Sequence, residues 1–280
     1  MTNAPGSTTA PLGPEEGRQS FSPAAQTVRD IARGGIAGII VGVLVAGVGG
    51  RLVMRVATML HEDAVGATTE AGEVVGRITL NGTLALIVFG GLGMGLVAGT
   101  IWVIIRPWIP GRGLARAFAT AVAAVAIGTP SLVQLTNVDF VFLDHDPVVV
   151  GLLVGLVGLV GFSIALVDGA LDARLPYPPS GVRISTVAYV IVSLIGLLLV
   201  LPAVVTTLMD KPEYRAPIRA GWALAATGAC TLALWLLRLR GQTTPPKVLR
   251  LAGSVSLLAA VILGAMTSLP HILAAAGLSS

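Results

Sequence analysis

The sequence predicts an all-α integral membrane protein, a polytopic helical bundle of about seven transmembrane helices with its N-terminus inside and its C-terminus outside. Hydrophobic residues make up 54 % of the 280 residues and charged residues only 11 %, and the mean hydropathy is +0.87. A soluble domain carries about 25 % charged residues, so this chain has too few charges to cover a water-facing surface. A series of charge-free stretches of membrane-spanning length completes the argument.

The same composition excludes several classes of protein. A disordered chain, an ordinary nucleic-acid-binding protein and a conventional soluble enzyme all need more charge or less apolar surface. The net charge of +4 therefore needs another explanation, which the topology provides below. The single cysteine, Cys230, rules out an intrachain disulfide and a thiolate metal cluster.

Residues 1–26 are predicted to form a disordered cytoplasmic tail. They are rich in Pro, Gly, Ser and Thr, a composition that cannot bury a core. No apolar segment follows a basic start, so this is not a signal peptide. The first long apolar stretch begins near Ile31.

Seven charge-free stretches are predicted to cross the membrane, because a transmembrane helix needs about 20 mostly apolar residues. Gly128 and Pro130 interrupt the third, and Pro270 is expected to stop the seventh. In chain order, the stretches lie at 34–50, 83–105, 117–138, 147–167, 184–208, 220–237 and 251–269.

The distribution of Lys and Arg predicts the orientation. With the N-terminus inside, the inner segments hold 12 of the 18 basic residues and the outer segments hold 6. Omitting one span would place the later basic loops on the wrong side. The net positive charge is therefore explained by the orientation of the chain in the membrane. The predicted location is the cell membrane, the inner membrane of a bacterium. Trp102 and Trp108 are expected to anchor the inner interface, as Trp222 does the outer one.

Glycine spacing predicts how the helices pack, because small residues let helix backbones approach closely in lipid. The first span carries a small residue at every fourth position, and the second and fourth repeat the pattern. The residues are Gly34, Gly38, Gly42, Ala46 and Gly50, then Gly91, Gly95 and Gly99, then Gly151 and Gly155. We therefore divide the membrane domain into a Gly-rich four-helix part at 27–168 and a three-helix part at 169–280.

Arg51 and Arg55 are the first candidates for a binding site. They lie one turn apart at the outer end of the first span, on one helix face, where two guanidinium groups could clamp an anionic group. Two structural alternatives remain: the arginines reach the interface by snorkelling, or they pair with Glu70, Glu73 or Asp139. The long outer loop that carries Glu70 and Glu73 could fold over the same mouth.

The histidines are the candidates for a metal site. His61, His145 and His271 all fall on the predicted outer side, but no pair has the spacing of helical metal ligands. We expect no metal and no cofactor. The spans carry no ionisable residue at mid-membrane, and Asp168 lies at the inner end of the fourth, which argues against proton-coupled transport.

Two segments of the first half resemble a known group of proteins. Residues 49–55, GGRLVMR, and residues 76–83, GRITLNGT, which lead into the Gly-rich second span, are similar to those of uncharacterised bacterial multi-pass membrane proteins. The resemblance implies a bacterial inner membrane. It implies no substrate, cofactor or catalytic residue.

The function expected from the sequence is that of a small permease-like transporter with an outward-facing polar vestibule near Arg51 and Arg55. The alternative is a non-enzymatic membrane component that binds a partner helix, a second copy of the chain or lipid through its Gly-rich faces. An enzyme is not expected, because no nucleophile–base or metal constellation is visible. The expected surroundings are the lipid bilayer, with no nucleic acid, and the small-molecule ligand is left open.

Overall fold

The computed structural model describes residues 23–61, 91–132, 146–175, 218–242 and 244–278, and the isolated positions 66, 82, 84, 187, 191 and 198. Within this part of the chain, 88 % of the residues are helical and none forms a strand. The all-α prediction is therefore confirmed for the described residues.

The first helix is a long rod with an irregular centre. α1 (Pro23–Val41) continues through a π-helical segment, η1 (Gly42–Gly47), into α2 (Val48–Leu60). The rod begins at Pro23, inside the predicted tail 1–26. Its 38 residues correspond to about 57 Å of helix, longer than the roughly 30 Å hydrocarbon core of a bilayer. Both charged ends of the rod can therefore lie outside the hydrocarbon.

Four described helices are long and apolar enough to cross a membrane, and two more are shorter. The four are Pro23–Leu60, Pro147–Arg174, Arg219–Leu239 and Lys247–Ala275, and the shorter apolar helices are Gly91–Ile105 and Gly113–Thr129. Of the predicted fifth span, 184–208, only the helical positions 187, 191 and 198 are described. The number seven and the orientation stay predictions.

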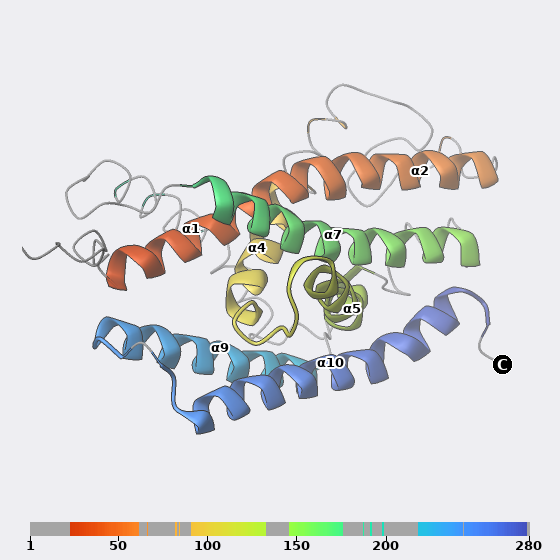
Figure 1. Cartoon of the computed structure of the whole chain (residues 1–280). Coiled ribbons are helices and arrows are strands. Elements are labelled where there is room, and N and C mark those ends of the chain that lie inside the picture. Colours follow the sequence, from red (N-terminus) through yellow and green to blue (C-terminus); the bar gives the residue numbers. More distant parts are fainter. Residues whose placement is uncertain are drawn as a thin grey trace, which may run out of the picture.

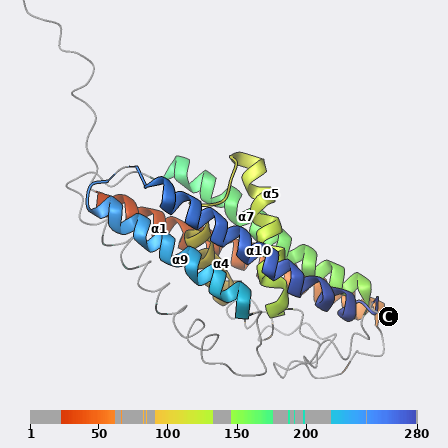
Figure 2. The same ribbon diagram turned by 90° about the horizontal axis from the view of Figure 1, so that it is seen from below.

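The helices form two layers with two further helices between them (Figure 1). α1, α2 and α7 (Pro147–Arg174) form one layer, and α9 (Ile218–Leu239) and α10 (Lys247–Ala275) form the other. α4 (Met94–Ile105) and α5 (Gly113–Leu132) lie between them. Figure 2 shows α5 crossing α7 and α10 rather than running alongside them.

The prolines inside helices do not end them. α5 continues over Gly128 and Pro130 to Leu132. The predicted stop at Pro270 is wrong, because α10 runs on to Ala275. A proline removes one backbone hydrogen bond, and packing can hold the helix together on either side of it. Before Pro270, the Ser268 hydroxyl donates to the Ala126 carbonyl of α5 at 2.7 Å.

The glycines of the first two spans pack against each other, as α1–η1 and α4 run antiparallel in close contact. A Cβ at Gly38 would lie 2.7 Å from the Gly99 Cα, and one at Gly42 would lie 2.5 Å from the Gly95 Cα. Both distances are too short for a side chain, so this contact requires glycine. These two Gly faces are therefore occupied within the molecule.

The predicted four-helix and three-helix parts contact each other directly. A Cβ at Gly264 of α10 would lie 2.6 Å from the Ala126 carbonyl oxygen of α5. The Thr231 hydroxyl of α9 donates to the Ile104 carbonyl of α4 at 2.7 Å, and Trp108 Nε1 donates to that hydroxyl at 2.8 Å. The division at 168 therefore does not mark a gap in the described bundle.

Candidate functional site

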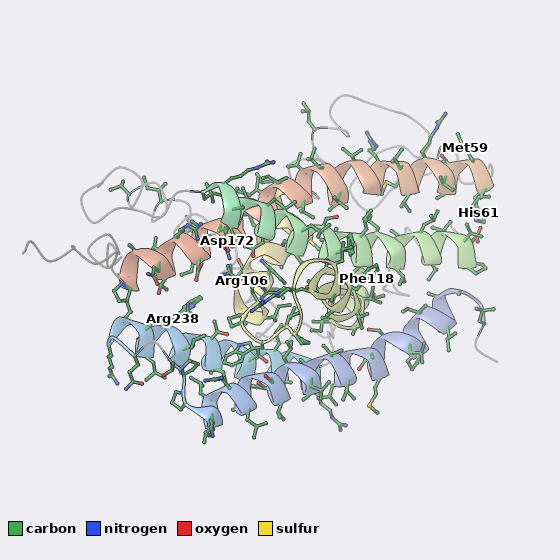
Figure 3. All side chains as sticks on the ribbon, viewed as in Figure 1. Met59, His61, Arg106, Phe118, Asp172 and Arg238 are labelled. Atoms are coloured by element: carbon green, nitrogen blue, oxygen red, sulfur yellow. The ribbon has the colours of Figure 1, made fainter. Side chains whose placement is uncertain are left out.

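Charged side chains from five helices meet at one end of the bundle. We call this group the arginine cluster and the end that carries it the arginine end. Figure 3 places Asp172, Arg106 and Arg238 there and His61 at the opposite end. The cluster consists of Arg29, Asp30, Arg33, Arg106, Arg116, Asp168, Asp172 and Arg238.

The centre of the cluster joins α1 to α7. Arg33 Nε donates to Asp168 Oδ1 at 2.8 Å, and Arg33 Nη2 lies 3.4 Å from Asp168 Oδ2. Arg33 Nη1 also contacts the Asp172 carboxylate. The side chains of Arg33 and Asp168 are only 3 % and 4 % exposed. This is a desolvated, fork-to-fork ion pair of the kind that fixes both position and orientation.

Arg29 closes the end of α7. Its Nη1 donates to Asp172 Oδ1 at 2.9 Å, and its Nη2 donates to the carbonyls of Asp172 and Leu175 at 3.0 and 2.8 Å. Carbonyls in the last turn of a helix lack partners within it and carry partial negative charge. A guanidinium there satisfies both the carbonyls and the carboxylate, so α1 caps α7 through a buried side chain.

Asp30 connects the cluster to α4 and α9. Its carboxylate lies 3.2 Å from Arg106 Nη2, 3.4 Å from Arg238 Nη1 and 3.9 Å from Arg33 Nη2. Arg106 also reaches Asp168, with 3.5 Å between Nη1 and Oδ1. One carboxylate therefore serves cations from three helices.

Arg116, in the first turns of α5, has no carboxylate partner among the described residues. Its Nη2 donates to the Arg106 carbonyl, and its guanidinium lies 5.3 Å from the centre of the Trp102 ring. Within the described part of the chain, Arg116 Nε and Trp102 Nε1 are buried and have no hydrogen-bond acceptor. The α4–α5 turn that brings them together passes through Gly111 and Gly113, with φ of +90° and +54°, values that favour glycine.

The cluster has more positive than negative charge. It holds five arginines and three aspartates; four of the arginines contact the aspartates, and every aspartate contacts at least two arginines. Burying ions costs several kcal/mol for each ion, and apolar residues often stabilise a protein as well or better. The cluster is therefore weak as a source of stability, and its position among membrane helices marks it as a candidate functional site.

The opposite end carries a smaller polar contact. His61, which ends α2, lies 2.9 Å through Nε2 from Asp146 Oδ2. Asp146 caps α7, because its Oδ1 accepts a hydrogen bond from the Val148 amide at 2.7 Å. That backbone bond, with a smaller contribution from His61, lowers the pKa of Asp146 below its usual value. Pro147 at the first helical position needs no amide partner there.

The predicted site residues are only partly described. Arg51 is half-buried on α2 and Arg55 is exposed, and both lie far along the rod from the arginine cluster. Glu70, Glu73, Asp139 and His145 lie outside the described residues, and His271 is described only as part of α10. His61 contacts a carboxylate, and no group of three or more His, Cys, Asp or Glu in the described residues could hold a metal ion.

Sequence reasoning missed the cluster, although the sequence holds a signal for it. Arg29 and Arg33 are four residues apart, and so are Asp168 and Asp172, so two basic and two acidic side chains each share a helix face. In the sequence analysis, Arg29 and Arg33 were used only to predict the orientation in the membrane. Trp102 and Trp108, expected as anchors at the inner interface, are only 1 % and 7 % exposed and pack inside the bundle, so their depth in a membrane stays a prediction. Trp222, at 67 %, is exposed as an anchor would be.

Comparison with protein-family models, curated proteins and solved structures finds no match to this chain. The resemblance of residues 49–55 and 76–83 to bacterial multi-pass membrane proteins therefore stays a prediction.

Proposed function

We propose that the protein is a small permease-like membrane transporter, and that the arginine cluster is the gate that closes its inner end. The observation that carries this proposal is the buried contact of Arg29 and Arg33 on α1 with Asp168 and Asp172 on α7. Ionisable groups buried among membrane helices are expensive, and they commonly lie on substrate pathways.

The sharing of partners suits a contact that opens and closes. Arg33 reaches all three aspartates, and Arg106 reaches two of them. A helix shift that breaks one pair can therefore form another, so that no buried charge is left alone. Breaking an isolated buried pair would cost about 3–5 kcal/mol, and exchange of partners lowers that barrier.

Charge supports placing the arginine end inside. Arg174 ends α7, Arg240 follows α9 and Lys247 begins α10. These three helix ends lie at the arginine end, whereas α2, which carries Arg51 and Arg55, leads to the other end (Figure 1). The excess of Lys and Arg on the cytoplasmic side is the general rule for such proteins. α7 and α9 both run toward the arginine end, which fits a crossing between them, as predicted at 184–208.

On this proposal, the mouth near Arg51 and Arg55 is the outward-facing vestibule. The transported solute would enter there while the arginine cluster keeps the inner end closed. The excess positive charge of the cluster would favour an anionic solute over a cationic one.

The test is transport into vesicles that contain the purified protein. The vesicles are incubated with a mixture of phosphate, sulfate, small carboxylates and amines, and the solutes inside are measured by mass spectrometry. We expect at least one anion to enter faster than into empty vesicles. Asp168→Asn should change its rate, whereas Arg240→Gln, which removes an exposed charge outside the cluster, should not.

The alternative is binding of a partner helix or lipid, and one observation favours it. Gly151 and Gly155 of α7 are exposed, and a Cβ at either would meet no described atom within 4 Å. The vesicle experiment separates the two functions. If no solute enters above the empty-vesicle rate, transport is contradicted and the binding role is favoured.

A further inference from the structure

We propose that the α4–α5 side of the arginine cluster binds a phosphate-type oxyanion, with Arg116 and Trp102 as its central donors. This binding site stands independently of transport, because it follows from the unbalanced charge and the unsatisfied donors of the cluster. The ligand is either a free phosphate or the phosphate of an anionic lipid headgroup.

The first argument is charge. The five arginines of the cluster exceed its three aspartates by two, and the carboxylates lie on α1 and α7. Arg116 is the cluster arginine without a carboxylate contact in the described residues, and it lies next to Arg106. Like charges held together away from water repel strongly. An anion on the α4–α5 side would balance the excess.

The second argument is the pair of donors without acceptors. Arg116 Nε and Trp102 Nε1 are both buried, and neither has an acceptor among the described residues. Trp102 is 1 % exposed, and the Arg116 guanidinium lies over its ring. Buried N–H groups are almost always satisfied by protein, water or ligand. Two such donors on neighbouring side chains indicate an acceptor that both could share.

The third argument is the position of Arg116 in the fold. It lies in the first turns of α5, a helix of 20 residues whose first turn carries no acidic residue. The N-terminus of a helix carries partial positive charge and amides without helical partners, which favour anions. Arg106 is 18 % exposed, so this side of the cluster is open to the surroundings of the bundle.

These features select phosphate chemistry. A phosphate has several acceptor oxygens, which can meet a planar guanidinium and an indole N–H together. Its charge near neutral pH, between about −1 and −2, matches the excess of the cluster. Basic pockets between transmembrane helices on the cytoplasmic side bind phosphate headgroups in this way.

The experiment measures binding of inorganic phosphate to the purified full chain in detergent by calorimetry. We expect Arg116→Gln to weaken binding by about tenfold or more, the effect of losing one charge-assisted contact. The matched control is Arg112→Gln, which removes an exposed charge from the same turn and should change the affinity less than about twofold. Trp102→Phe keeps the ring but loses one donor, and we expect an intermediate loss.

A second arm identifies the source of the phosphate. The protein is placed in phosphatidylcholine nanodiscs with or without phosphatidylglycerol, and its thermal unfolding is followed without free phosphate. Stabilisation by phosphatidylglycerol that Arg116→Gln abolishes and Arg112→Gln retains would assign the site to a lipid headgroup. Binding of free phosphate alone would assign it to a soluble oxyanion.

Equal effects of Arg116→Gln and Arg112→Gln in both arms would overturn the proposal. If Arg116→Gln fails to fold, Trp102→Phe decides in its place. Unchanged binding of both probes to folded Trp102→Phe would then overturn it, because the indole N–H would have no ligand to lose.

Discussion

Asp168 is the aspartate most deeply buried in the arginine cluster. It contacts Arg33 and Arg106, and its side chain is 4 % exposed, against 47 % for Asp172 on the same helix. Removing the negative charge at 168 leaves a buried guanidinium with less compensation than removing it at 172. Substitutions at 168 and 172 remove the same charge from a buried and from a half-exposed position, so comparing them isolates the effect of burial on stability.

We expect Asp168→Asn to lower the free energy of unfolding by about 3 kcal/mol, the cost of breaking a buried pair. Asp172→Asn should cost less than half as much, because water screens a half-exposed charge. Unfolding in mixed micelles with increasing denaturing detergent measures both. Equal losses for the two variants would contradict the burial argument.

Asp146 should make stability depend on pH at the other end of the bundle. Its pKa is lowered in the folded protein by the Val148 amide first and by His61 second. The ionised cap therefore stabilises the protein above the unfolded pKa of about 3.9. This contribution is lost as the pH falls through the lower folded value.

The measurement is the melting temperature of the wild type and Asp146→Asn from pH 7 down to pH 2, because the contribution is lost only below the unfolded pKa. We expect the wild type to melt higher at neutral pH and the two proteins to converge in the acid range. His61→Gln should keep most of this pH dependence, since the backbone bond is the larger cause. A difference between wild type and Asp146→Asn that does not vary with pH would refute the assignment.

At the residue scale, the sequence could identify the charges but not their partners. Arg33 and Asp168 are 135 positions apart, and no local pattern says which helix faces which. An arginine at position 33 fits the positive-inside rule, and it also fits a buried ion pair. The sequence alone therefore does not say which of the two roles Arg33 has. Only the packing of α1 on α7 distinguishes them.

At the scale of elements, the fourfold glycine spacing predicted a close helix approach, and the Gly contact between α1–η1 and α4 is such an approach. The prediction named the small residues and their role in close helix packing, and the structure shows that α4 is the helix that packs against α1–η1. The spacing could not reveal that η1 is π-helical from Gly42 to Gly47. The wider turn of a π-helix depends on how the rod fits its neighbours, and π-helical segments commonly mark functional positions.

Gly38→Ala and Gly50→Ala should have opposite effects on stability. A Cβ at Gly38 would lie 2.7 Å from the Gly99 Cα, whereas one at Gly50 meets nothing described within 4 Å. We expect Gly38→Ala to cost about 1–3 kcal/mol through overpacking. Gly50→Ala should be neutral or stabilising by up to about 1 kcal/mol through helix propensity. Detergent unfolding of both variants checks the signs, and a stabilising Gly38→Ala would contradict the close contact.

Helix ends were the least accurate part of the sequence prediction. Pro270 was expected to stop the last span, but α10 continues to Ala275. The charge-free rule also stopped the fourth span at Val167, whereas α7 runs to Arg174. Tertiary contacts hold both ends: buried ion pairs with α1 stabilise the last turns of α7, and Ile272 and Ala275 of α10 pack against Val150 of α7.

At the scale of the whole molecule, the parity of the membrane crossings decides on which sides the two termini lie. The described residues contain six helical rods, four of full membrane length and two shorter. Six crossings would place both termini on the same side, and the predicted seven would place them on opposite sides. The composition predicted a membrane protein. Whether the number of crossings is even or odd depends on residues 184–208, which are predicted to be a span from their apolar content alone.

Labelling of single cysteines tests the parity. In a Cys230→Ser background, a cysteine replaces exposed Ala24 or exposed Leu278, and intact cells are treated with a membrane-impermeant maleimide. Seven crossings with the N-terminus inside predict labelling at 278 and none at 24 until the membrane is opened. Equal labelling at both positions before opening would contradict the topology.

The most direct test of the gate proposal is the distance between α1 and α7 at each end of the bundle. Spin labels on cysteines at Ala24 and Ala173 report the arginine end, and labels at Met59 and Val148 report the opposite end. All four positions are exposed in the structure. Asp168→Asn with Asp172→Asn should lengthen or broaden the first distance in vesicles and leave the second unchanged. A folded double variant with both distances unaltered would show that the arginine cluster does not hold that end closed.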